Sequence, residues 1–132
     1  MRATFINPPT LSKPTGYSHV AIAAWGRQVH LSGQVAFASD GQLVGDGDLA
    51  AQAEQVYLNI KAGLAAAGAD ISHVFKVVTY VVDLDADKAA AVRTVRLRHF
   101  GDGPYPASTM VGISALVDPR LLIEIEAIAA LD

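Results

Sequence analysis

The feature that most constrains the fold is the last extended segment, residues 121–130, with the sequence LLIEIEAIAA. It is rich in isoleucine and contains neither glycine nor proline, which is typical of a β-strand. Because successive side chains of a strand point to opposite faces, Glu124 and Glu126 share one face and Ile123 and Ile125 the other. Two carboxylates in an apolar strand cost free energy if they are buried without partners. Either this face is solvated at a sheet edge, or Glu124 lines a pocket.

The composition predicts a single domain spanning residues 1–132. With 132 residues, of which 52% are apolar, the chain is long and apolar enough to bury a core. No apolar run approaches the roughly 20 residues that span a bilayer, and the N-terminus has no apolar stretch typical of a secretory signal. Cysteine is absent, which excludes disulfides and thiolate chemistry and fits the cytoplasm, where we expect the protein.

Charge and histidine content argue against two classes of partner. The net charge is −3 and no basic block is present, so the sequence gives no support to a nucleic-acid partner. The four histidines are dispersed without the spacing of metal ligands, so no metal site is expected.

Two helices are predicted. Residues 46–67 carry an apolar stripe at helical spacing, with Asp48 as N-cap and Gly68 as the stop, and their polar residues, Gln52 among them, are expected to face solvent. Residues 86–100 form the second helix, capped by Asp85. Its arginines at 93, 96 and 98 are expected on a solvated face near the C-terminal end, where cations complement the helix dipole.

The remaining segments predict an α+β fold with both helices on one face of a mixed or mostly antiparallel sheet. Segments 19–24 and 29–32 are expected to pair as a hairpin across residues 25–28. The other strands are expected at 3–5, 73–82, 107–113 and 121–130, with a short extended piece at 35–37. Because two helices cover only one face of the sheet, the apolar residues of the other face predict self-association.

Several short motifs, in this order, resemble those of the Rid family, also called YjgF or reactive intermediate deaminase proteins. They are Gly16-Tyr17, residues 31–34, 51–60 and 77–84, Phe100-Gly101, Pro106-Ala107 and residues 123–129. The resemblance covers nearly the whole chain. It implies a chorismate-mutase-like domain with a six-stranded mixed sheet, two helices on one face, and a homotrimeric barrel with ligand clefts between subunits.

The resemblance also implies a chemistry and a set of site residues. The best-understood branch of the family hydrolyses imines and enamines, such as 2-iminopropanoate, to 2-oxo acids and ammonia without a cofactor. Its arginine clamps the substrate carboxylate, and a glutamate of the last strand handles water. Carried to this chain, Glu124 is the catalytic residue, Tyr17 closes the cleft, and Ser32 and Gly33 border it.

At one position the chain departs from the family pattern Pro-Ala-Arg-Ser/Thr, because Ser108 stands where the clamping arginine would be. Losing a charge-assisted hydrogen bond weakens carboxylate binding about 10- to 100-fold. The expected cleft therefore offers the hydroxyls of Ser108 and Thr109 and the apolar Met110, and suits a neutral or cationic small molecule. On this view Ser108→Arg would raise activity on 2-iminopropanoate. Whether Arg93 or Arg27 supplies a replacement cation is left open.

Three functions follow from these residues. The favoured one is a cofactor-free, deaminase-like hydrolase of an imine, an enamine or a related small molecule, different from a typical 2-iminopropanoate deaminase. The alternative is a homotrimer that binds a small molecule without catalysis. An endoribonuclease or translation inhibitor is the weakest, because the chain is acidic and has no basic stripe.

Overall fold

The computed structural model describes residues 3–23 and 26–132, which form six strands, two α-helices and a short 3-10 helix. The strands are β1 (Ala3–Ile6), β2 (Val20–Ala23), β3 (Arg27–Gln34), β4 (Val74–Val82), β5 (Ala107–Ile113) and β6 (Ile123–Leu131). The helices are α1 (Leu49–Ala66), η1 (Ile71–His73) and α2 (Ala86–Phe100). The predicted α+β class and both predicted helices are confirmed. No described helix combines the length and apolar character needed to cross a membrane.

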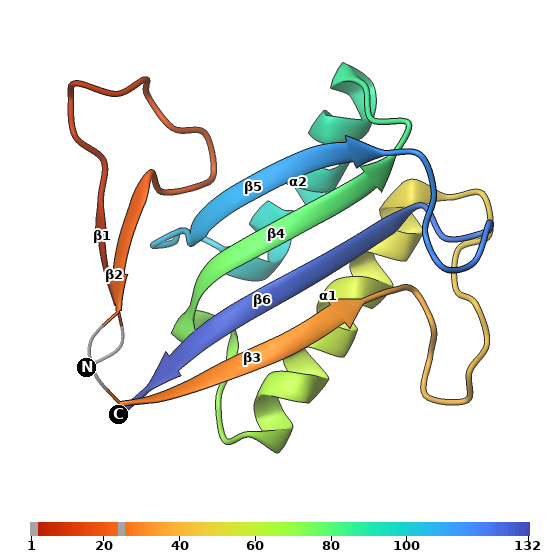
Figure 1. The fold of residues 1–132 in the computed structure, drawn as a ribbon, viewed down its shortest axis with the longest axis horizontal. Helices are drawn as coiled ribbons and strands as arrows, with labels where there is room; N and C mark the ends of the chain where they lie inside the picture. The colour runs from red at the N-terminus through yellow and green to blue at the C-terminus, as the bar shows by residue number, and fades with distance from the viewer. Residues whose placement is uncertain (1–2, 24–25) are drawn as a thin grey trace.

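Four strands form a mixed sheet in the order β3-β6-β4-β5, with both helices behind it in Figure 1. Strand β6 pairs antiparallel with both of its neighbours, whereas β5 runs parallel to β4. Helix α2 connects β4 to β5 and brings the chain back to the end of the sheet at which β4 begins. Strand β5 therefore runs parallel to β4.

Strands β1 and β2 form a separate two-stranded sheet, so the six strands do not make the single sheet that was predicted. The predicted hairpin is also wrong, because β2 pairs with β1 and β3 pairs with β6. Alternation of side chains identifies a strand but not its partner, which is decided by long-range packing. Residues 24 and 25, between the two arms of that hairpin, lie outside the described residues.

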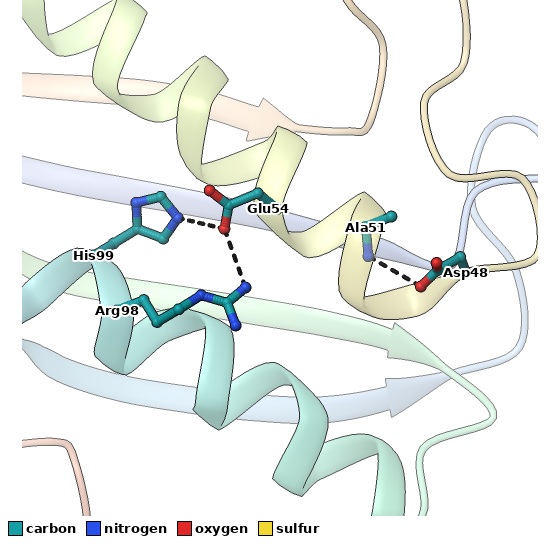
Figure 2. A network of polar contacts seen from close by, with 5 residues as sticks. All are labelled: Asp48, Ala51, Glu54, Arg98 and His99. Atoms are coloured by element: carbon teal, nitrogen blue, oxygen red, sulfur yellow. Dashed lines mark hydrogen bonds and ion pairs between the residues drawn. The ribbon is translucent and has the colours of Figure 1, made fainter.

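The ends of both helices follow the sequence. Asp48 accepts a hydrogen bond from the backbone N–H of Ala51 (3.1 Å; Figure 2), and Gly68 after α1 has a φ of 76°. Asp85 caps α2 in the same way by accepting from the N–H of Lys88 (2.8 Å).

Gln52 on α1 is completely buried, which overturns its predicted exposure. Its amide donates to the carbonyl oxygens of Gly45 (3.1 Å) and Arg120 (2.9 Å) and accepts from the N–H of Leu122 (2.8 Å). An amide whose hydrogen bonds are made can be buried at little cost. Gln52 therefore fastens the loop before α1 and the loop before β6 to the helix.

The core lies between the sheet and the helices. Val77 and Val81 of β4 and Ile123 and Ile125 of β6 point toward the helices and are at most 1% exposed. They pack with buried side chains of α1 and α2, among them Val56, Ile60, Leu64, Val92 and Val95. This register sends the intervening residues of the same strands to the opposite face.

That opposite face, called here the open face, is not covered by any described element of the single chain (Figure 1). The hydroxyl of Tyr80 donates to Oε1 of Glu126 (2.6 Å), and this hydrogen bond raises the pKa of Tyr80. Lys76 Nζ donates to Oγ1 of Thr109 (3.1 Å), and Val111 beside them is 39% exposed. The open face therefore mixes paired polar groups with apolar surface.

Candidate functional site

A cavity of about 270 Å³ lies between α2, β5 and the loop before β2. We call it the α2–β5 cavity. Its lining consists of Thr15, Tyr17, Leu84, Ala89, Arg93, Arg96, Ser108 and Met110. Three residues expected at a ligand site from the sequence, Tyr17, Ser108 and Met110, are therefore brought together.

Tyr17 reaches the cavity because its loop packs closely against α2. Gly16 has a φ of 72°, and a methyl group placed on it would lie 3.0 Å from Cδ2 of Leu97 and 3.5 Å from Nη2 of Arg96. Glycine is needed here for both the conformation and the close approach. On the other side of Tyr17, the buried Ser18 donates its N–H to the carbonyl of Pro106 (3.0 Å), which ties the loop to the start of β5.

Arg96 is the residue whose environment departs most from expectation. It is 4% exposed rather than solvated, and its Nη1 donates to the hydroxyl Oγ of Ser108 (3.1 Å). Burial lowers the pKa of Arg96, and the nearby positive charge of Arg93 adds to the lowering. An arginine nevertheless stays protonated in proteins, so a cation is held in the wall of the cavity. The helical spacing of α2 indicates this burial, because Arg96 lies four residues after the buried Val92 and therefore on the same side of the helix.

Two buried polar atoms, one of them on the cavity-lining Arg96, have no hydrogen-bond partner among the described residues. They are Nε of Arg96 and the hydroxyl of Tyr57. Burial raises the pKa of Tyr57, so this phenol stays neutral. The Tyr57 ring stacks on His99 at 5.0 Å between ring centroids.

A polar network anchors α2 to α1 (Figure 2). His99 Nε2 lies 2.8 Å from Oε2 of Glu54, and Nη2 of Arg98 lies 3.4 Å from the same oxygen. The hydrogen bond with His99 is the main cause that lowers the pKa of Glu54. The contact between His99 and Glu54 ties the C-terminal half of α2, which carries Arg96, to α1, and the exposed Arg98 adds only the longer contact.

The charge of the cavity is positive. Arg93 and Arg96 both line it, and no aspartate or glutamate is among the described residues that line it. Of the two cations considered from the sequence, Arg93 lines the cavity, whereas Arg27 is exposed at the start of β3. Two guanidinium groups without a counter-charge favour an anion, which argues against the neutral or cationic ligand predicted from the sequence.

Glu124 lies on the open face, not in the α2–β5 cavity. Strand pairing sets Glu124 beside Tyr80 and Ser108 beside Val77, and Tyr80 and Val77 point to opposite faces of β4. A cleft that contains both Glu124 and Ser108, as expected from the sequence, is therefore not formed within one chain, because β4 runs between their strands.

Gly33 on β3 lies next to the side chain of Glu124. A methyl group placed on Gly33 would lie 2.6 Å from the carboxyl carbon Cδ of Glu124, so only glycine leaves room for this carboxylate. Thr109 lies on the open face, where it accepts a hydrogen bond from Lys76. Ser32, which precedes Gly33, is exposed. The expected site residues therefore form two groups, one in the cavity and one on the open face. Within residues 3–23 and 26–132, no three histidine, aspartate or glutamate side chains gather as a metal site would require.

Known proteins share this fold, and their similarity to this chain extends over the residues of the cavity and of the open face. The family model described as Endoribonuclease L-PSP matches residues 10–131. The crystal structure of YyfB, a Rid-family protein from Yersinia pestis, superposes with a TM-score of 0.92 at 41% identity, covering 99% of this chain and 100% of that one.

Two curated relatives extend this picture. Protein DfrA of Myxococcus xanthus is 40% identical over 114 residues, which is 86% of this chain and 83% of that protein. The 2-iminobutanoate/2-iminopropanoate deaminase of Dermatophagoides farinae is 29% identical over 127 residues, or 96% of this chain and 95% of that protein. The range matched by the family model includes every residue that lines the cavity, and Glu124 as well.

Proposed function

Since this chain belongs to the endoribonuclease L-PSP (Rid, YjgF) family, we propose that it is a cofactor-free, deaminase-like hydrolase of a small anionic imine or enamine. The observation that carries the proposal is the buried Arg96, which donates to Ser108 in the wall of the α2–β5 cavity. The relative named as a 2-iminobutanoate/2-iminopropanoate deaminase supports this reaction class.

In this proposal Arg96 and Ser108 together replace an arginine at position 108. The hydroxyl of Ser108 accepts from Arg96, so its own proton is available to a ligand oxygen. A carboxylate in the cavity would receive this hydrogen bond as well as charge-assisted bonds from the guanidinium. Such an anion would also offset the cost of burying Arg96 without a counter-charge.

The second part of the proposal is a homotrimer in which Glu124 of one subunit completes the cavity of another. It is supported by the uncovered open face and by Glu124, for which no hydrogen bond or ion pair is found within the described residues. Glu124 would take a proton from water while the water oxygen attacks the imine carbon, and would return that proton to the departing nitrogen. In the resulting carbinolamine the hydroxyl proton passes through the same carboxylate to the amine nitrogen, the carbon–nitrogen bond breaks, and the products are a carbonyl compound and ammonia.

The test follows imine decay. An amino-acid oxidase generates imines in situ, semicarbazide traps the remainder, and wild type is compared with Glu124→Gln and with Glu126→Gln as the matched control on the same strand. We expect wild type to accelerate decay, Glu124→Gln to lose about 100-fold or more, and Glu126→Gln to retain most of the activity. Equal activity of Glu124→Gln and wild type would refute the catalytic assignment, and a monomer in light scattering would refute the shared site.

One observation favours a second candidate, a non-catalytic binding protein. In the described part of one chain, no residue that lines the cavity has a carboxyl group that could act as a base. Ligand binding without any acceleration of imine decay would select this candidate. The endoribonuclease alternative finds no such support, because the chain is acidic overall.

A further inference from the structure

We propose that the α2–β5 cavity selects small ligands with two negative charges, and that Arg93 is the residue that sets this selectivity. The inference deepens the function proposed above and rests on it for its catalytic consequence. Its binding part can be tested separately.

The first argument is the count of charges. Arg93 and Arg96 are three residues apart on α2, so their Cβ atoms lie about 5–6 Å apart on one side of the helix. Both line the same cavity, and none of its other described lining residues is acidic. Like charges at this spacing repel, and the repulsion is felt at Arg96, whose pKa Arg93 helps to lower. One monoanion neutralises only half of the positive charge that the described residues of one chain bring to the cavity.

The second argument is the state of each guanidinium. Arg96 is fixed by burial and by Ser108, while its Nε is buried without a partner. Arg93 is half-buried, and no hydrogen bond or ion pair to it is found in the described part of the chain. A guanidinium that only stabilised the fold would be expected to pair with an acid, as Arg98 pairs with Glu54. Arg93 instead lies free at the cavity, where it can bind a second anionic group.

The third argument is size. A cavity of about 270 Å³ lies near the lower end of ligand pockets and admits a molecule of a few carbons rather than a nucleotide or peptide. The ligand class is therefore a short dicarboxylate or another compact dianion. An imine derived from a dicarboxylic amino acid combines this class with the proposed chemistry.

The experiment is calorimetric titration of the 132-residue chain at low salt with three probes: succinate, butanoate and inorganic phosphate. Succinate and butanoate have the same chain length and differ in one carboxylate, and phosphate carries its charge on a single centre. We expect succinate or phosphate to bind about 10- to 100-fold more tightly than butanoate. Whichever of succinate and phosphate binds more tightly shows whether the two negative charges must lie on separate groups.

Variants then assign the effect. Arg93→Gln should reduce binding of the dianion to the level of butanoate and leave butanoate binding within about twofold, whereas Arg93→Lys should keep part of the preference. Arg98→Gln is the matched control on the same helix and should bind like wild type. Thermal unfolding of each variant shows whether it is folded. Equal affinities for succinate, phosphate and butanoate in wild type, or a preference that survives Arg93→Gln, would overturn the inference.

The outcome also separates this inference from the hydrolase proposal. Arg93-dependent dianion binding without imine hydrolysis would retain the inference and reject the hydrolase. Hydrolysis of imines that depends on Glu124, with no preference for a dianion, would retain the hydrolase and reject the inference.

Discussion

Nη1 of Arg96 donates a 3.1 Å hydrogen bond to the hydroxyl of Ser108. The two residues lie 12 positions apart, on α2 and β5, and meet in the wall of one cavity. The cavity that Ser108 lines therefore contains a guanidinium although position 108 is a serine. The guanidinium comes from the neighbouring helix, and the serine positions it.

Arg96→Met is expected to separate binding from stability. Removing the guanidinium should weaken anion binding about 10- to 100-fold, because charge-assisted hydrogen bonds are lost. The free energy of unfolding should change by about 1 kcal/mol or less, since an apolar side chain of similar length replaces a buried, incompletely paired charge. Titration with succinate and urea unfolding measure the two quantities. Arg98→Met is the control, and a loss of several kcal/mol in Arg96→Met alone would show that Arg96 is primarily structural.

Ser108→Arg is expected to fail as a restored clamp. From the sequence alone it should raise activity on 2-iminopropanoate, but here it would add a third guanidinium beside Arg93 and Arg96. Repulsion and crowding in a cavity of about 270 Å³ should lower stability and leave turnover unchanged or reduced. Imine decay and thermal unfolding of the variant are the measurements. A clear gain in turnover would mean that Arg96 does not bind the substrate carboxylate.

Gly33→Ala should act through Glu124. The added methyl group would lie 2.6 Å from Cδ of Glu124, at the far end of a side chain that can rotate away. The stability cost should therefore be small, about 1 kcal/mol or less, whereas catalysis that needs this carboxylate should fall about as far as in Glu124→Gln. Gln28→Ala, at an exposed position of the same strand, is the control. Unchanged turnover in Gly33→Ala would argue that the position of Glu124 does not matter.

Glu54 should stabilise the fold in a pH-dependent manner. Its pKa is below 4.5, mainly because of the hydrogen bond with His99, so the unfolded state binds the proton more tightly. The stabilisation is present above pH 4.5 and is lost as the pH falls through the lowered pKa. Because Glu54 is partly exposed, the pair contributes only about 0.2–1 kcal/mol. Urea unfolding of wild type and Glu54→Gln at pH 7 and at acidic pH tests this, and a difference that persists in acid would exclude the carboxylate as its cause.

Gln52→Ala should be strongly destabilising, by about 3 kcal/mol, because it leaves two carbonyl oxygens and one N–H without their partner in a buried position. Urea unfolding measures the loss. Gln42→Ala, an exposed position, should change the free energy of unfolding by less than about 0.5 kcal/mol. Comparable small effects for both variants would mean that the Gln52 hydrogen bonds are replaced by water.

Local features were readable from the sequence because they depend on neighbouring residues. The range of α2, the range of β5, and the caps Asp48 and Asp85 follow from helical periodicity, β-branched runs and side chains that accept from N–H groups three residues on. The same period of two separated Glu124 from Ile123 and Ile125 before any tertiary contact was known.

What the sequence by itself determined is thus the α+β class, the position of most elements, and the family through its ordered motifs. The tertiary structure decided which strand pairs with which, and hence that β4 separates Ser108 from Glu124. It also decided that Arg96 is buried and that Gln52 is buried with its hydrogen bonds made, although both residue types ordinarily face water. Pairing and burial depend on contacts between residues far apart in the chain, and local periodicity specifies a face without specifying what will cover it.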